Sequence, residues 1–245
     1  MLRPRRRTRL VATAAVFASI YAILGLIPIS ALVGTGGFIT FREAISPLAG
    51  MVLGPLAGGL SIVLGVFLDF GLGRPVVFLG LDFMVDLLAA VLAGLCFTGR
   101  RKLALGLPIL VLAVFVSSPF SLPSVGVGGV EVPFVWMHLL SVVALGAALL
   151  LEARKVIGRL SWAFVTSVTL ASTMAAHAMG GILTENVYLA RGVLFGYQTV
   201  SSYWTYIFYL YPEERIFLTV VGALVSVPVL RALSRTRRDE AIASG

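Results

Sequence analysis

The sequence predicts an all-α membrane protein, a polytopic bundle of about eight hydrophobic helices with both termini in the cytoplasm. Three observations predict this fold. The chain of 245 residues is 59% hydrophobic and 12% charged, and its mean hydropathy of +1.01 exceeds what a water-exposed surface accommodates. Long apolar runs follow one another along the chain. The basic residues, which give a net charge of +8, lie almost entirely between those runs.

Each predicted helix follows from an apolar run. The runs cover residues 10–29, 40–71, 77–98, 103–121, 135–152, 162–184 and 215–232. The first run is interpreted as an uncleaved helix, because its roughly 20 residues make a full span and no small-residue cleavage motif closes it. We therefore expect basic cytoplasmic tails at 1–9 and 234–245, on either side of a single transmembrane domain at 10–233.

The run 40–71 contains Gly54-Pro55 at its midpoint and is long enough for two short helices. If the run crosses the membrane once, the basic clusters at 100–102 and 154–159 fall outside the cell. If it turns at Gly54-Pro55 and returns, both clusters fall in the cytoplasm, where basic loops are favoured. The sequence therefore predicts a hairpin. Each arm would reach about 22 Å at about 1.5 Å per residue, short of a hydrocarbon core of about 30 Å, so the hairpin either spans fully or is re-entrant.

The predicted outer segment 185–214 is long for a connection between two spans. It carries the aromatic sequence YQTVSSYWTYIFYLYP from Tyr197 to Pro212. Such aromatic density suits a helix or strand that lies in the outer interface of the bilayer and anchors the protein there. The alternative is a lid over a bound substrate.

Small residues form a strip on the first predicted helix. Ala14, Ala18 and Ala22 lie four residues apart and therefore share one face. In lipid, helices associate where small side chains let backbones approach closely. The strip predicts either packing within the bundle or a docking surface for another protein. The same two roles, packing within the bundle or docking of a partner protein, are predicted for three residues at the turn of the hairpin: Gly54, Pro55 and Gly58.

These features resemble the substrate-binding subunit (S component) of energy-coupling factor transporters. The resemblance rests on the alanine strip, the Gly-rich outer loop after it, and ISPLAGMVLGPLAGGLSIVLGVFLD, which is similar to that family's short second helix, Gly-Pro turn and third helix. It covers roughly residues 10–100. It implies capture of a vitamin or other micronutrient, with a membrane coupling protein and ATPase subunits as partners. Members of that family typically have six spanning helices, two fewer than predicted here, so substrate identity does not carry over.

Ionisable side chains inside apolar runs are costly and mark candidate binding groups. Asp86 lies deepest, near the midplane of the predicted helix 77–98, and Asp82 lies one turn away on the same face. Two acids at this spacing suit a cationic group of a substrate, a shared proton or a cation. The alternative is that hydroxyl, backbone or arginine partners satisfy each acid. Arg42 and Glu43 open the hairpin at the outer face.

A second group of candidates lies in and after the run 162–184. His177 lies inside the run, and Glu185 and Asn186 lie at its outer end. A neutral histidine bonded to a neighbouring helix is the structural alternative for His177. The predicted substrate-binding set is therefore Arg42, Glu43, Asp82, Asp86, His177, Glu185 and Asn186.

Composition and motifs exclude several classes of function. One cysteine and two histidines leave no metal site of the usual density, so no metal or cofactor is predicted. The chain has no nucleophile-elbow serine and no Walker loop, so we expect no enzyme activity, and any ATP hydrolysis would belong to a partner. The basic residues serve membrane orientation, so no nucleic-acid partner is expected. Membrane lipid and a small-molecule substrate are the expected partners.

Three functions remain compatible with the sequence. The favoured one is a plasma-membrane capture subunit for ATP-driven micronutrient uptake, with a cavity bounded by the loop 30–43, the Asp82/Asp86 helix and the His177 helix. The second is a stand-alone proton- or cation-coupled secondary transporter with Asp86 as its coupling site. The third is a non-transporting membrane assembly protein that uses its glycine-rich faces to bind partners.

Overall fold

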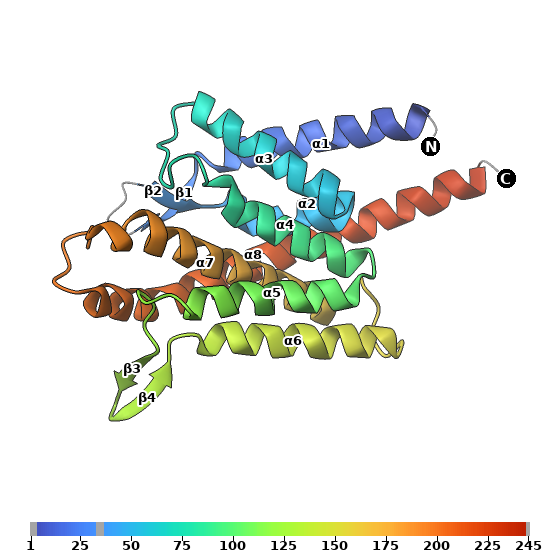
Figure 1. Cartoon of the computed structure of the whole chain (residues 1–245). Helices are drawn as coiled ribbons and strands as arrows, with labels where there is room; N and C mark the ends of the chain where they lie inside the picture. Colours follow the sequence, from blue (N-terminus) through green and yellow to red (C-terminus); the bar gives the residue numbers. More distant parts are fainter. Residues whose placement is uncertain (1–3, 33–36, 244–245) are drawn as a thin grey trace.

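The computed structural model describes residues 4–32 and 37–243, and this part of the chain is predominantly helical (Figure 1). The predicted count of eight α-helices is confirmed for these residues. The helices are α1 (Pro4–Leu24), α2 (Arg42–Leu53), α3 (Pro55–Gly71), α4 (Phe83–Phe97), α5 (Arg101–Val116), α6 (Trp136–Ala153), α7 (Trp162–Val187) and α8 (Val200–Ala243). A short 3-10 helix covers Leu189–Arg191. The four strands are β1 (Pro28–Leu32), β2 (Gly37–Thr40), β3 (Ser124–Val127) and β4 (Val130–Pro133), and they form two separate antiparallel hairpins.

Two helices in the described part of the chain are long and apolar enough to cross a membrane. They are α6 and the part of α8 from Val200 to Thr236. The apolar parts of three other helices are shorter: Thr8–Leu24 in α1, and the whole of α3 and of α4. The chain therefore contains helices whose length and composition suit membrane association.

The run 40–71 folds as two helices that reverse direction at Gly54. Gly54 has a φ of +82°, a conformation that glycine adopts without strain, and Pro55 takes the first helical position of α3, where a missing N–H costs nothing. Arg42 at the start of α2 pairs with Asp69 near the end of α3, so α3 returns to the level where α2 begins. The predicted hairpin is confirmed. Its arms have 12 and 17 residues.

Glycines bring the helix backbones of the hairpin and of α4 into direct contact. A Cβ atom added at Gly50 in α2 would lie 1.8 Å from the carbonyl oxygen of Ala90 in α4. A Cβ atom added at Gly94 in α4 would lie 2.4 Å from the nitrogen of Pro55 in α3. Only glycine permits such approach, so α2 and the start of α3 pack backbone to backbone against α4.

The structure corrects the docking interpretation of the alanine strip at two positions. Ala18 and Ala22 are each 3% exposed and face the interior of the bundle. A Cβ atom at Gly65 in α3 would lie 3.0 Å from the carbonyl oxygen of Ala18, which shows how closely α1 and α3 pack. The packing alternative accounts for these residues, because neither is accessible to another protein.

The remaining residues of the predicted coupling set divide between buried and accessible positions. Gly58 is buried against α2, since a Cβ atom there would lie 2.7 Å from the carbonyl oxygen of Ala49. Ala14, Gly54 and Pro55 are partly exposed. Only these three stay available for contact with a partner.

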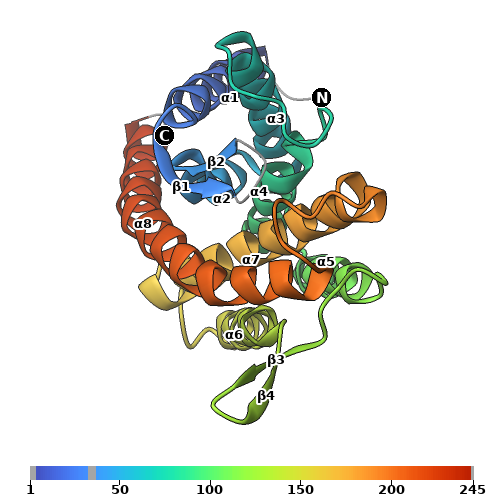
Figure 2. The ribbon, with the colours of Figure 1, turned by 90° about the vertical axis from the view of Figure 1, so that its left-hand side faces the viewer.

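The last helix begins earlier than the sequence predicts. α8 starts at Val200 instead of near residue 215 and continues for 44 residues, so most of the predicted outer segment 185–214 is helical. Pro212 lies inside the helix, and Figure 2 shows α8 changing direction along its length. The predicted tails 1–9 and 234–245 are likewise largely helical, because α1 begins at Pro4 and α8 reaches Ala243.

The aromatic segment at the start of α8 has a buried face and an exposed face. Tyr203, Trp204 and Tyr211 are buried, whereas Tyr206 and Tyr209 are exposed. The indole N–H of Trp204 donates to the carbonyl oxygen of Phe120 at 2.7 Å. Only the outer face of this segment is therefore available for the predicted interfacial anchoring, and its inner face packs within the bundle.

The two ends of the bundle differ in charge. The ends of α1 and α8 that lie nearest the termini share one end with the α4–α5 and α6–α7 connections (Figure 1). We call this the basic end, because those connections carry the clusters at 100–102 and 154–159. Arg159 donates from Nη1 to the carbonyl oxygen of Phe97 at 2.8 Å and so ties the two connections together. Both β-hairpins lie at the opposite end (Figure 1).

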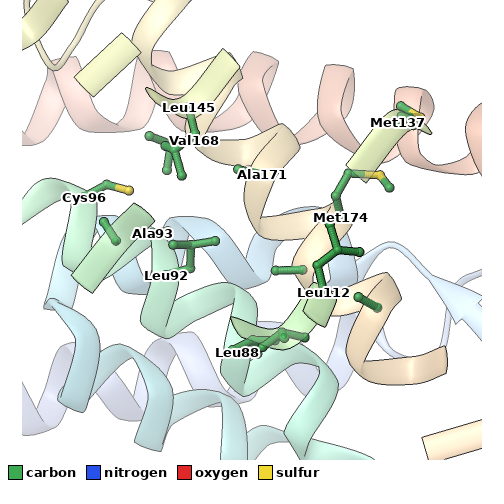
Figure 3. Packing of buried hydrophobic residues seen from close by; sticks show 14 of the residues in the cluster. Leu88, Leu92, Ala93, Cys96, Leu112, Met137, Leu145, Val168, Ala171 and Met174 are labelled. Carbon is green, nitrogen blue, oxygen red and sulfur yellow. The ribbon is translucent and has the colours of Figure 1, made fainter. Parts of the chain in front are cut away.

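The largest apolar core packs α4 and α5 against α6 and α7 (Figure 3). Leu92 and Cys96 of α4, Leu112 of α5, Leu145 of α6 and Met174 of α7 are all buried in it. This packing holds α4 and α7 firmly beside each other. Both helices extend from the core toward the end that carries the β-hairpins.

Candidate functional site

A pocket lies at the end of the bundle opposite the basic end. About 110 Å³ of it can be reached by the centre of a water molecule, whereas one water needs about 10–15 Å³ on that measure. The pocket therefore has room for a small organic molecule. Its polar lining is Arg42, Glu43, Arg74, Asp82, Asp86, His177, Thr184, Glu214 and Arg215. Its aromatic lining is Phe38, Phe78, Tyr203, Trp204 and Tyr211.

Five of the seven predicted substrate-binding residues line this pocket: Arg42, Glu43, Asp82, Asp86 and His177. The other two do not line it. Glu185 is fully buried elsewhere, and Asn186 is exposed, with its Nδ2 donating to the carbonyl oxygen of Ile182 at 2.7 Å. Of the predicted boundary loop 30–43, residues 33–36 lie outside the described residues, and Ala31, Phe38 and Ile39 line the pocket.

A buried ion-pair network forms one wall of the pocket. Arg42 donates from Nη1 to Oδ2 of Asp69, and its Nε lies 3.7 Å from Oδ2 of Asp86. Arg74 donates to the same oxygen of Asp69 at 3.1 Å. Gly25 at the end of α1 leaves room for this carboxylate, because a Cβ atom there would lie 2.4 Å from Oδ2. The network places two arginines against two acids.

Asp86 is held by three groups from two helices. The Tyr21 hydroxyl of α1 donates to Oδ2, and the Ser46 hydroxyl of α2 donates to Oδ1 at 2.8 Å. Arg42 supplies the opposing charge. Asp86 lies in the first turn of α4, nearer the start of its helix than the sequence predicts, because α4 begins at Phe83 and not at residue 77. The partnered alternative describes Asp86.

Asp82 has a structural role before α4. Its Oδ1 accepts the backbone N–H of Val77, and its Oδ2 accepts that of Phe78, both at 3.0 Å. These bonds hold residues 77–82 in a turn, which is why this part of the predicted helix 77–98 is not helical. Asp82 caps α4 one turn before Asp86, and both line the pocket, but backbone N–H groups already satisfy both oxygens of Asp82, as the structural alternative for this acid supposed.

We expect Tyr21→Phe to lower the free energy of unfolding by about 1.5–3 kcal/mol, the range for a hydrogen bond to a charged group. The substitution keeps the ring, over which the Arg42 guanidinium lies at 5.1 Å, and removes only the donor to Asp86. Thermal unfolding in one detergent would measure the effect. Tyr209→Phe, at an exposed position of α8, is the control and should change stability little. Equal effects of the two substitutions would contradict the proposed role of the Tyr21 hydroxyl.

Arg215 enters the pocket from α8 and was not among the predicted site residues. It is buried, and its Nη1 and Nη2 lie 3.6 Å from Glu43 and 3.7 Å from Glu214. Both distances exceed hydrogen-bonding range. Its Nε has no hydrogen-bond partner among the described residues. The sequence did not single out this arginine, because it stands at the first residue of the last apolar run, 215–232, and not inside it.

A signal for Arg215 is nevertheless present in the sequence. Trp204, Tyr211 and Arg215 are spaced by seven and four residues, and such residues share one helical face. All three line the pocket. Reading this spacing as a helix through Pro212 would have brought Arg215 into the candidate set.

The two histidines form a partly buried pair at the pocket wall, in which His138 is buried and His177 lines the pocket. Nε2 of His138 lies 3.0 Å from Nδ1 of His177, and the His177 ring stacks on Tyr211 with a centroid distance of 4.7 Å and an interplanar angle of 25°. A hydrogen bond between two imidazoles requires one nitrogen to donate and the other to accept. His177 therefore contacts both the pocket and a neighbouring helix.

The described residues contain no group of three or more His, Cys, Asp or Glu side chains placed to hold a metal ion. What the pocket offers a ligand is therefore charge, hydrogen bonds and aromatic surface. Comparison of the chain with protein-family models, curated proteins and solved structures finds no match.

Proposed function

We propose that the protein is the substrate-capture subunit of an ATP-driven micronutrient uptake transporter of the energy-coupling factor type, embedded in the plasma membrane with both termini in the cytoplasm. The observation that carries the proposal is a polar pocket at the end of the bundle opposite the basic end. Because basic loops favour the cytoplasm, this arrangement turns the pocket toward the outside, where a nutrient is captured.

The apolar surface supports a membrane location. Large apolar side chains are exposed on helices at opposite sides of the bundle, and soluble proteins rarely expose so many. They include Val11 and Ile23 of α1, Leu56 and Leu60 of α3, and Leu140 and Val143 of α6. Lipid is the partner that fits this surface.

The β1–β2 hairpin supports capture with occlusion. Phe38 and Ile39 of β2 line the pocket beside the start of α2. In the proposed mechanism this hairpin closes over the nutrient. Reorientation of the whole subunit, powered by separate ATPase subunits through a membrane coupling protein, then releases the nutrient inside the cell.

The proposal is tested by ligand binding and by dependence on partners. The purified protein would be screened for thermal stabilisation by a panel of vitamins and their precursors. A ligand at one hundred times its Kd stabilises by about 2.7 kcal/mol. Uptake of the same compound should require co-production of ATPase and coupling subunits. Uptake by the chain alone, driven by an ion gradient, would contradict the proposal.

A coupling partner that docks on α1 would have to use the exposed face of that helix. Ala15 lies on that face, next to the buried strip. We expect Ala15→Trp to retain ligand binding and to abolish uptake, because the larger side chain would separate the helices that must approach. Val143→Trp, at an equally accessible position on α6, is the control. Loss of uptake in both variants, or in neither, would contradict the prediction that the partner docks on α1.

A proton-coupled secondary transporter is the second candidate, and Glu185 favours it. Asp86, the coupling site expected from the sequence, is fully engaged by its three partners. Glu185 is completely buried, and the Ser118 hydroxyl is the one polar side chain near its carboxylate among the described residues, at a geometry too poor for a regular hydrogen bond. Burial of an unpaired charged carboxylate is costly, so such a group is suited to carry a proton.

Glu185→Gln separates the two candidates. In the capture subunit, the substitution should leave ligand binding and ATP-driven uptake close to those of the unmodified protein. In the proton-coupled transporter, it should abolish concentrative uptake while exchange of labelled for unlabelled substrate continues. The measurement is flux into proteoliposomes with and without a pH gradient.

A further inference from the structure

The guanidinium of Arg215 is the least satisfied polar group on the pocket wall. Its three nitrogens carry five N–H donors, and its two carboxylate neighbours lie at 3.6 and 3.7 Å, beyond hydrogen-bonding distance. Other donors hold those neighbours in place. Glu43 accepts the backbone N–H of Thr40 at 3.3 Å, and Glu214 accepts the hydroxyl of Ser30. A ligand in the pocket would therefore supply the acceptor that Arg215 lacks.

The charges around Arg215 disfavour an anion as that acceptor. Glu43 and Glu214 both lie within 4 Å of the guanidinium, so one positive charge faces two negative ones. A carboxylate or phosphate bound there would be attracted by one charge and repelled by two.

The other two arginines of the pocket add no free positive charge that would attract an anion. Arg42 and Arg74 are both engaged by Asp69, and Arg42 also faces Asp86. A neutral oxygen acceptor gains the hydrogen bond to Arg215 and avoids the repulsion.

The face of α8 beside Arg215 is aromatic. Tyr211 lies one helical turn before Arg215, a rise of about 6 Å, and Trp204 lies two turns further back. Both line the pocket, as does His177, which stacks on Tyr211. Packing within the bundle leaves Tyr211 and Trp204 only 1% and 2% exposed, so a ligand lying along α8 would place a ring against the small pocket-facing parts of these two side chains while a group at the ring's edge reaches Arg215.

We propose that the pocket selects an uncharged planar ring that bears a carbonyl-type acceptor, with the ring against Tyr211 and Trp204 and the acceptor on Arg215, and that it discriminates against carboxylate and phosphate ligands. This inference rests on the proposed capture function and specifies its substrate class. A cationic ligand fits less well, because it would leave the donors of Arg215 without an acceptor.

The experiment uses ligands that share one ring and differ in charge. Nicotinamide, nicotinate and 1-methylnicotinamide form one such set, and riboflavin and its 5′-phosphate form another. Binding to the full-length protein in lipid nanodiscs would be measured by calorimetry. We expect the neutral member of at least one set to bind at least about tenfold more tightly than its charged relatives. Tighter binding of an anionic or cationic member, or binding by neither neutral compound, would overturn the inference.

Substitutions at the site give a second readout. Arg215→Gln should weaken binding of the neutral ligand by about ten- to a hundredfold, the effect of losing a hydrogen bond to a charged group. Glu43→Gln and Glu214→Gln remove the repulsion, so each should raise the affinity for the anionic member relative to the neutral one by about tenfold. Misfolding cannot produce that gain. An unchanged ratio in both glutamate variants would contradict the charge argument.

One control variant and the uptake experiment keep this inference distinct from the proposed function. Arg101→Gln changes an exposed ion pair with Glu152 at the basic end and should leave every affinity unchanged. Partner-dependent uptake of a charged solute would overturn the neutral-ring inference while leaving the capture function in place. Absence of any ligand and any uptake across the nutrient panel would contradict the capture function itself.

Discussion

Replacing Gly50 with alanine is expected to lower the free energy of unfolding by about 3 kcal/mol or more, at the upper end of what overpacking costs. The added Cβ atom would lie 1.8 Å from the carbonyl oxygen of Ala90. That oxygen belongs to a helix backbone, so no side-chain rotation relieves the clash. α2 and α4 would have to separate, and the pocket residues Arg42 and Asp86, which these helices carry, would separate with them.

Gly106→Ala is the matched control for this prediction. Gly106 also lies inside a helix, and a Cβ atom there would meet no atom within 4 Å. Alanine is the better helix former, so this substitution should raise stability by about 0.5–1 kcal/mol. The measurements are the thermal unfolding midpoint and the monodisperse yield of both variants in the same detergent. Similar behaviour of the two variants would mean that α2 and α4 are not packed as closely as described.

The hairpin could be predicted from the sequence because its signals are local. Gly54-Pro55 breaks a helix through the conformations of those two residues alone, and counting charges fixes the direction of the return. The continuity of α8 could not be predicted in the same way. Pro212 and the aromatic residues before it indicate a loop locally, whereas contacts such as the bond from Trp204 to Phe120 favour a helix. Those contacts join segments 84 residues apart.

The sequence predicted most residues of the candidate site but not the contacts between them. Arg42 and Asp86 stood out because charges in apolar runs are costly. Their roles depend on partners that spacing along the chain cannot indicate, since the Tyr21 hydroxyl lies 65 residues from Asp86. The backbone partners of Asp82 could not be predicted, because a run of apolar residues does not distinguish a turn held by a carboxylate from the first turn of a helix. Arg215 was missed for the related reason that its helix begins before the apolar run.

Replacing Arg42 with methionine is expected to destabilise the protein by about 3–5 kcal/mol, as removal of one partner from a buried ion pair does. Methionine approximates the length of the arginine stem and carries no charge. It would leave Asp69 and Asp86 both buried without the guanidinium between them, and Arg74 would reach only Asp69. Arg101→Met is the control at an exposed pair, where the loss should stay below about 1 kcal/mol.

The decisive comparison is between Arg42→Met alone and Arg42→Met combined with Asp69→Asn and Asp86→Asn. If the cost arises from two uncompensated carboxylates, neutralising them should recover more than half of the lost stability, because the amide oxygens can still accept the hydrogen bonds from Tyr21 and Arg74, while the amide nitrogen at position 86 can donate to the Ser46 hydroxyl oxygen. If the cost arises from lost packing of the arginine stem, the triple variant should be no more stable than the single one. The unfolding midpoint therefore reports whether this wall of the pocket is held together by its charge balance or by its shape.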